Sequence, residues 1–234
     1  MSDRCWAVVP AAGVGRRMGG EVPKQYLTLS GTRIIDHTLA RLLRHPRIRD
    51  VYVALSEEDP HWQSCDHAGD PRVIRTQGGE ERCHSVLNAL HRLAESAGES
   101  DWVLVHDAAR PCLSEADLDH LINTLLDHPV GGLLGVPVND TLKRVSGENK
   151  IEATVSRDRL WRAFTPQMFR LGLLTRSLEA AIRNGAAVTD EAGAMELSGH
   201  QPLMVEGAAG NIKITRPEDL HLAGFYLSSS EYPS

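Results

Sequence analysis

Residues 5–26 read CWAVVPAAGVGRRMGGEVPKQY, an apolar run followed by a loop rich in alanine and glycine. The apolar run from Cys5 to Val9 predicts a buried β-strand, which Pro10 ends. Gly13 and Gly15 have no Cβ, so the backbone there can turn tightly and approach a ligand closely. The segment therefore predicts a strand followed by a loop whose backbone N–H groups face a ligand.

Positive side chains surround this loop. Arg16 and Arg17 follow the glycines, and Lys24 lies behind Pro23. Backbone N–H groups combined with such charges form sites for phosphate groups. We therefore expect the loop to bind a polyphosphate, the alternative being an ordinary surface connection between a strand and a helix.

Two common phosphate-binding loops do not match the segment. A Walker A loop ends in Gly-Lys-Ser/Thr, whereas Lys24 lies between Pro23 and Gln25. A dinucleotide-binding turn of the form G-x-G-x-x-G needs a third glycine, and Met18 stands at that place. The sequence therefore disfavours an NAD-dependent oxidoreductase.

The composition is typical of one globular domain that handles a small anion. The chain has 234 residues, 41% of them hydrophobic and 24% charged, with a net charge of -6. Nucleic-acid-binding domains are usually positive, so that class is disfavoured. The scattered cysteines form no C-x-x-C pair, which predicts free thiols in a reducing cytoplasm. No apolar run resembles a signal peptide or a membrane span. We expect a single cytoplasmic domain, residues 1–234, without nucleic-acid or membrane partners.

Strands and helices alternate along most of the chain. Apolar runs predict strands at 51–55, 72–76, 102–105, 163–169, 203–206 and 212–215. Helical spacing predicts helices at 33–45 with Thr32 as N-cap, at 80–97, after the N-cap Ser114, at 171–184, at 190–197 and from Pro217. This alternation predicts an α/β fold with a doubly wound, mostly parallel sheet that binds ligands at the carboxyl ends of its strands.

Residues 137–157 depart from this alternation. Two alternating runs, 141–145 and 151–155, flank the polar turn 146–150, which is the pattern of a β-hairpin. A lone hairpin is only marginally stable in water. We therefore expect a protruding arm that packs against a second copy of the chain and supports a homodimer.

Asp107 follows the apolar strand 102–105, where α/β sheets display their functional groups. Ala108 and Ala109 separate it from Arg110, and their small side chains leave room for a ligand. A carboxylate here suits Mg²⁺ or another divalent cation, which takes one or two protein carboxylates plus substrate phosphates. A plain Asp–Arg ion pair is the alternative. We expect His106 to be a hydrogen-bonded strand-end residue, not a catalytic base.

Gly78 and Gly79 precede a predicted helix whose N-terminus carries free N–H groups and positive partial charge. Glu80, Glu81 and Arg82 could contact a base or ribose, and Ser85 could donate a hydrogen bond to a base. The alternative is that the glutamates only complement the helix dipole.

Further motifs, spread along the whole chain, accompany the glycine loop of residues 10–20. They are GGEER at 78–82, VLVHDAARP at 103–111, DTLK at 140–143, TPQ at 165–167, TDEA at 189–192 and NIKIT at 211–215. With P-A-A-G-x-G-x-R-M and P-K-Q-Y, they resemble the nucleotidyltransferases that make nucleoside diphospho-compounds. In detail the chain resembles the 2-C-methyl-D-erythritol 4-phosphate cytidylyltransferase family of the non-mevalonate isoprenoid pathway.

The resemblance implies a Mg²⁺-dependent transfer of CMP from CTP to 2-C-methyl-D-erythritol 4-phosphate by in-line attack on the α-phosphorus, giving 4-diphosphocytidyl-2-C-methyl-D-erythritol and pyrophosphate. The implied catalytic residues are Arg17, Lys24, Arg157 and Lys213. The implied CTP-binding residues are Pro10, Ala11, Ala12, Gly13, Gly15, Lys24, Gly79, Glu80, Ser85, Asp107 and Ala108. The implied acceptor-binding residues are Asp107, Arg110, Thr141, Arg157, Thr165 and Lys213. Asp107 is also the implied metal ligand.

Two other functions stay open. One is a related nucleotidyltransferase with another acceptor, such as ribitol 5-phosphate, and the other is a nucleotide-binding module without catalysis. The family usually has charged residues where this chain has Ala208, Gly210 and Ser156, and a common Asp where it has Glu80. The first three differences bear on how the acceptor is oriented and leave the triphosphate loop unchanged.

Overall fold

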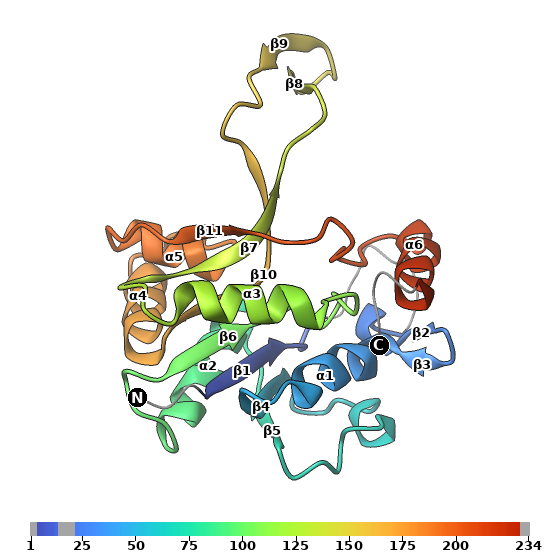
Figure 1. Cartoon of the computed structure of the whole chain (residues 1–234), viewed down its shortest axis with the longest axis vertical. Coiled ribbons are helices and arrows are strands. Elements are labelled where there is room, and N and C mark those ends of the chain that lie inside the picture. The colour runs from blue at the N-terminus through green and yellow to red at the C-terminus, as the bar shows by residue number, and fades with distance from the viewer. Residues whose placement is uncertain (1–3, 14–21, 230–234) are drawn as a thin grey trace.

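A seven-stranded sheet forms the centre of the protein, in the order β11-β7-β10-β6-β1-β4-β5 (Figure 1). The computed structural model describes residues 4–13 and 22–229. The strands are β1 Cys5–Pro10, β4 Ile48–Leu55, β5 Val73–Gln77, β6 Trp102–Val105, β7 Gly131–Pro137, β10 Trp161–Arg170 and β11 Leu203–Glu206. β10 runs antiparallel to β6 and β7, and the other pairs are parallel. The predicted mostly parallel α/β sheet is confirmed.

β1 is buried on both of its faces. Cys5, Ala7 and Val9 point into one hydrophobic core. Trp6 and Val8 point into the other. A strand covered on both sides needs an uninterrupted apolar run, which is what the sequence supplies here. Because β1 lies between β4 and β6, the residues that follow it lie at the carboxyl ends of interior strands of the sheet.

Helices cover both faces of the sheet, as Figure 1 shows. α1 (Ile34–Arg44) and α3 (Glu115–Leu125) pack on the first core, and α2 (Arg82–Ala94), α4 (Leu171–Arg183) and α5 (Glu191–Leu197) pack on the second. The predicted N-cap Ser114 is confirmed, because its side chain accepts a hydrogen bond from the N–H of Asp117. Within the described residues, no helix is long and apolar enough to cross a membrane.

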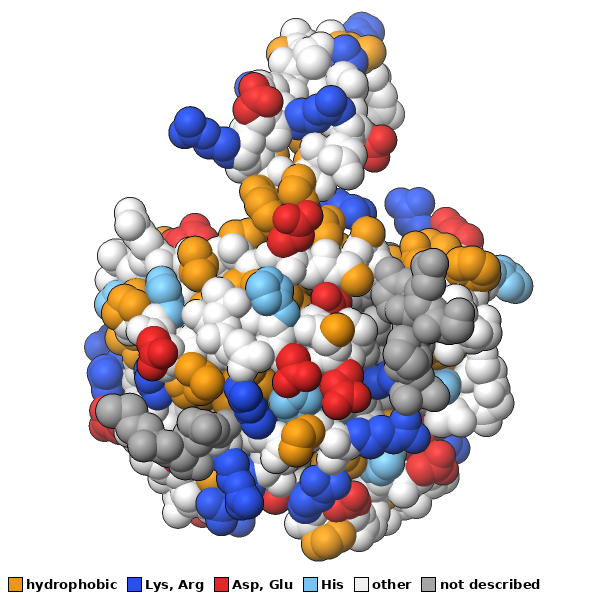
Figure 2. Space-filling view, viewed as in Figure 1, with side chains coloured by type: hydrophobic (Ala, Val, Ile, Leu, Met, Phe, Trp, Pro, Cys, Tyr) orange, Lys and Arg blue, Asp and Glu red, His pale blue; other side chains and the backbone are white. Residues whose placement is uncertain are grey.

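The predicted hairpin is confirmed as a two-stranded sheet of its own. β8 (Leu142–Val145) pairs antiparallel with β9 (Ile151–Val155). In Figure 1 this arm rises from the ends of β7 and β10 and stands clear of the body. Figure 2 shows charged side chains on the arm and hydrophobic ones at its base.

A third, smaller hydrophobic cluster packs early segments of the chain against α6. The short strands β2 (Thr28–Leu29) and β3 (Thr32–Arg33) pair antiparallel, and α6 (Pro217–Ser228) lies near them. Buried residues of this cluster are Leu29, Ile34, Cys112, Ile214 and Ala223. Single-turn helices η2 (Lys24–Tyr26) and η3 (Trp62–Ser64) complete the elements. The sequence did not predict β2 and β3, because each strand is only two residues long.

Two sequence predictions are wrong at this end of the molecule. Thr32 does not cap a helix, because it belongs to β3 and α1 begins at Ile34. Residues 212–215 do not form a strand. The N–H of Ile214 donates instead to the carbonyl of Ala109 in the loop after β6.

Candidate functional site

A cavity of about 390 Å³ opens at the carboxyl ends of β1 and β6, where folds of this class bind ligands. Five segments form its wall: the loop after β1, the single-turn helix η2, the turn before α2 with the start of that helix, the loop after β6 and the segment before α6. The lining residues are Pro10, Ala11, Ala12, Gly13, Lys24, Gln25, Gly79, Glu80, Glu81, Arg82, Ser85, Asp107, Ala108, Ala109, Lys213 and Thr215. Every residue predicted to bind CTP is among them except Gly15, which with Arg17 lies outside the described residues.

Gln25, which the sequence analysis did not single out, holds the loop after β1. Its buried side-chain amide donates to the carbonyl of Ala11 at 2.7 Å and to that of Gly13 at 3.1 Å. These two carbonyl oxygens are therefore paired with the protein. Such pairing suits a loop that must present N–H groups, not oxygens, to phosphate.

The turn before α2 packs closely against the same loop. A Cβ on Gly78 would lie 2.3 Å from the Cβ of Ala12, so only glycine permits this approach. The N–H of Gly79 donates to Ser85 Oγ at 2.9 Å, and that hydroxyl donates to the carbonyl of Glu81 at 3.1 Å. α2 begins at Arg82, two residues later than predicted, because the preceding residues form this turn.

Asp107 is the centre of charge in the cavity wall. Its Oδ2 lies 2.8 Å from Lys213 Nζ and 3.6 Å from Arg110 Nε. Its Oδ1 lies 3.0 Å from Arg82 Nε. Burial alone would raise the pKa of Asp107, but the positive charges of Arg82, Lys213 and Arg110 hold it well below its usual range. Asp107 is thus an ionised carboxylate that borders the cavity.

A chain of hydrogen bonds supports Asp107 from behind. Its N–H donates to Thr165 Oγ1 at 3.0 Å, which lies 3.1 Å from His106 Nδ1. His106 Nε2 lies 3.0 Å from the carbonyl oxygen of Arg110. Because a carbonyl only accepts, Nε2 carries the hydrogen, and Nδ1 accepts from the threonine. Burial lowers the pKa of His106 to about 4. His106 is therefore a neutral, hydrogen-bonded residue, as predicted.

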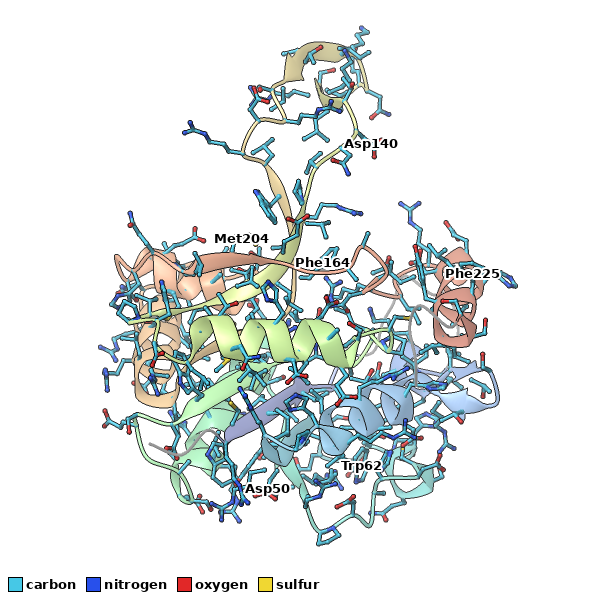
Figure 3. All side chains as sticks on the ribbon, in the orientation of Figure 1. Asp50, Trp62, Asp140, Phe164, Met204 and Phe225 are labelled. Carbon is cyan, nitrogen blue, oxygen red and sulfur yellow. The ribbon has the colours of Figure 1, made fainter. Side chains whose placement is uncertain are left out.

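Arg110 is buried behind the cavity wall. Its guanidinium donates to the carbonyl of Asn211 at 2.7 Å and lies 4.8 Å from the centre of the Phe164 ring. In Figure 3, Phe164 lies where the chain leaves the sheet for the arm. Arg110 and Thr165, both predicted to bind the acceptor, thus contact Asp107 and lie outside the lining of the cavity.

The pair formed by Arg82 and Glu191 was missed by the sequence analysis. The guanidinium of Arg82 donates to both carboxylate oxygens of Glu191, at 2.6 and 3.0 Å. Burial alone would lower the pKa of Arg82, but Glu191 and Asp107 raise it. Both residues lie in motifs of the sequence, yet they are 109 positions apart, and nothing in the pattern connects them.

Thr141 and Arg157 are not brought to the cavity of their own chain. Both are exposed, and the guanidinium of Arg157 donates to the carbonyl of Asn139 near the base of the arm. The predicted acceptor set is therefore divided. Asp107 and Lys213 line the cavity, whereas Thr141 and Arg157 belong to the arm.

The residues around Asp107 fit a divalent cation that brings most of its own ligands. Among the described residues, the one cluster with three potential metal-binding side chains is Glu81, Cys83 and His84, which does not include Asp107. Mg²⁺ commonly takes one or two carboxylates and completes its shell with water and substrate phosphates. Asp107 supplies such a carboxylate, and Lys213 is the most exposed of its three cationic partners.

A glycine loop at the carboxyl end of a central strand, two lysines and an ionised carboxylate in one cavity are the features of a nucleotidyltransferase. A family model agrees, matching residues 5–229 as "2-C-methyl-D-erythritol 4-phosphate cytidylyltransferase". The chain belongs to this family.

Relatives and solved structures agree with this assignment. Proteins with the same name from Pseudomonas putida strain GB-1 and Pseudomonas fluorescens strain SBW25 are each 55% identical to this chain, and the matches cover 92% of both chains for the first, and 94% of this chain and 95% of the relative for the second. A crystal structure of 4-diphosphocytidyl-2C-methyl-D-erythritol synthase superposes with a TM-score of 0.84 at 37% identity, covering 96% of this chain and 99% of that one. The enzyme of Francisella tularensis gives 0.84 at 36% identity, covering 96% and 100%.

Proposed function

We propose that this protein transfers CMP from CTP to 2-C-methyl-D-erythritol 4-phosphate. An oxygen of the acceptor phosphate forms a bond to the α-phosphorus, the bond from that phosphorus to the β-phosphate oxygen breaks, and pyrophosphate leaves. The observation that carries the proposal is the cavity that joins the glycine loop, the turn at Gly79 and the Asp107–Lys213 pair. The names of the relatives supply the acceptor.

The nucleotide half of the cavity fits CTP. The backbone N–H groups of Ala12 and Gly13 would receive the triphosphate, since Pro10 has no N–H and that of Ala11 donates to the carbonyl of Ala54. Lys24 would neutralise charge that builds up in the transition state. The segment from Gly79 to Ser85 would contact the cytidine. The acceptor itself supplies the nucleophile, so the protein needs only to align the reactants and stabilise negative charge.

The acceptor half requires a second copy of the chain. Lys213 lines the cavity, but Thr141 and Arg157 lie on the arm and outside it. We infer that the arm, residues 137–157, docks on a partner in a homodimer and delivers these side chains to the partner's cavity. Exposed apolar residues on the arm, Val145 and Ile151, suit such a contact.

Asp107 would hold a divalent cation, taken to be Mg²⁺, which when bound neutralises charge on the triphosphate.

The cysteines bear on the cellular compartment in which the protein works. All four cysteines are buried free thiols, which suits the reducing cytoplasm, and we place the protein there.

Pyrophosphate release by the purified protein tests the function. CTP, UTP, ATP and GTP are each offered with Mg²⁺ and with methylerythritol phosphate or ribitol 5-phosphate. We expect release only with CTP and methylerythritol phosphate. Release with another pair would change the acceptor or base assignment, and CTP binding without release by any pair would favour a nucleotide-binding module.

A further inference from the structure

Glu191 is a carboxylate deep in the protein, with 1% of its surface exposed. It lies at the start of α5, and hydrogen bonds hold that helix end in place. Asp190 accepts from the N–H of Gly193 at 3.0 Å. The side chain of Gln167 donates to Asp190 at 2.9 Å and accepts from the N–H of Ala192 at 2.8 Å. Glu191 is thus anchored to β10 and has little freedom to move.

Arg82 connects Glu191 to Asp107 in the cavity wall. Its planar guanidinium presents its N–H groups in a rigid fork. The two terminal nitrogens meet Glu191 at 2.6 and 3.0 Å, and Nε meets Asp107 Oδ1 at 3.0 Å. Because the fork is rigid, the place of Glu191 determines the angle at which Arg82 reaches Asp107.

The two carboxylate oxygens of Asp107 therefore have different surroundings. Oδ1 is held by Arg82, which is itself held by buried Glu191. Oδ2 is held by Lys213, whose side chain is 38% exposed, and more loosely by Arg110 at 3.6 Å. One side of the carboxylate is fixed by the protein, and the other faces a partner that can be exchanged for a ligand.

We propose that Glu191 is a positioning residue, which acts through Arg82 to orient Asp107 for the transfer reaction. The inference rests on the proposed function. A buried ion pair is a poor source of stability, since apolar residues of similar volume often serve as well or better. The pair with Arg82 is better explained by the orientation that it gives to Asp107.

Three variants separate the effect of orienting Asp107 from the effects of losing a charge and of destabilising the fold. In Glu191→Gln the fork loses one charged acceptor while the volume is kept. Arg82→Lys keeps the positive charge but replaces the rigid planar fork with a flexible point charge, which cannot fix the angle between the two carboxylates. The double variant Arg82→Met/Glu191→Met removes both charges, and Asp107 keeps Lys213 and Arg110 as partners, so the fold stays measurable even if single variants unfold.

We expect kcat of pyrophosphate release to fall roughly 10–100-fold in all three variants, with KM for CTP changing less than about threefold. The double variant should keep a wild-type midpoint of urea unfolding while losing turnover. Wild-type kcat in the stable double variant, or in folded Arg82→Lys, would overturn the proposal. The matched control is Glu179→Gln. Glu179 is a partly exposed residue of α4 that pairs with His91 of α2, so its replacement should leave kcat unchanged.

A spectroscopic readout tests the positioning without turnover. The Nε–H of Arg82 should give a protected ¹H–¹⁵N signal, assigned by its loss in Arg82→Lys. In Glu191→Gln we expect this proton to exchange with water at least about tenfold faster. Unchanged exchange would mean that Arg82 is held without Glu191, and the proposal would fail. If wild-type protein releases no pyrophosphate, the proposed function fails instead, and this exchange rate still decides the role of Glu191.

Discussion

Lys24 Nζ donates a hydrogen bond of 2.9 Å to the carbonyl oxygen of Ile214, 190 positions further along the chain. The N–H of Ile214 in turn donates to the carbonyl of Ala109 in the loop after β6 at 2.9 Å. Three segments from distant parts of the sequence are therefore tied together at one place. As a result, the Lys24 side chain, which lines the cavity, is held by the segment that carries Lys213.

Replacing Lys24 by alanine should lower kcat of pyrophosphate release by roughly 10²–10³, the usual cost of losing one preorganised charge-stabilising donor. Steady-state kinetics with saturating CTP and acceptor measure the effect. Arg176→Ala is the control, because Arg176 is an exposed residue of α4 that pairs with Glu99. Turnover close to wild type would remove Lys24 from the mechanism.

Gly78→Ala should weaken CTP binding by roughly 10–100-fold, since displacement of a binding loop by about 1 Å can cost that much. The added Cβ would lie 2.3 Å from Ala12 Cβ and 3.1 Å from the carbonyl oxygen of Leu55, so the loop after β1 must shift. Calorimetric titration with CTP measures the change. Gly69→Ala, where a Cβ meets nothing within 4 Å, serves as the control. Equal affinities of Gly78→Ala and wild type would show that the contact is not needed.

His106 should make folding sensitive to acid. Burial lowers its pKa from 6.5 to about 4, so between these values the unfolded chain binds a proton that the folded chain does not. Its contribution to the free energy of unfolding is complete above about pH 6.5 and is lost as the pH falls towards 4, by roughly 3 kcal/mol.

Urea unfolding at pH 7 and pH 4.5 measures this contribution. His106→Gln should lose less stability between the two pH values than the wild type, whereas His221→Gln, at an exposed position of α6, should behave as the wild type does. The same loss in all three proteins would exclude His106 as the source.

Deleting the turn residues 146–150 should weaken dimerisation and raise KM for the acceptor together, with CTP binding unchanged. The turn sets the register in which Val145 pairs with Ile151, and both side chains are exposed and apolar. Sedimentation velocity measures the dimer. Gly147→Ala, at an open position of the turn, is the matched control. An unchanged dimer after the deletion would rule out the arm as its support.

Much of the fold follows from local pattern. Strand 102–105 is a continuous apolar run bounded by polar residues, and its limits were predicted to the residue because a strand buried on both faces leaves no ambiguity. Segment 212–215 shows the limit of that reasoning. Its alternation matches a strand, but its backbone pairs with a loop carbonyl, which depends on what the fold places beside it.

The residues of the site also differ in whether the sequence predicts them. The residues lining the cavity from Pro10 to Gly13 and at Asp107 could be predicted, because they follow directly from strand ends. Gln25 and Glu191 could not. Gln25 acts on a loop 12 to 14 positions earlier through side-chain bonds, and Glu191 acts through Arg82 from another helix. Such contacts exist only once the chain has folded and have no period in the sequence.

Among the described strands of the central sheet, only β10 runs antiparallel to both of its neighbours. It enters the sheet directly from the arm and carries Thr165, whose hydroxyl accepts from the N–H of Asp107. Residues 156–160 separate β9 from β10, and β10 then leads from the base of the arm, where Trp161 pairs with Pro137, to the charged centre of the cavity. If a partner binds the base of the arm, that contact reaches the same strand that holds the Asp107 carboxylate in place, so assembly and catalysis would depend on one structural element.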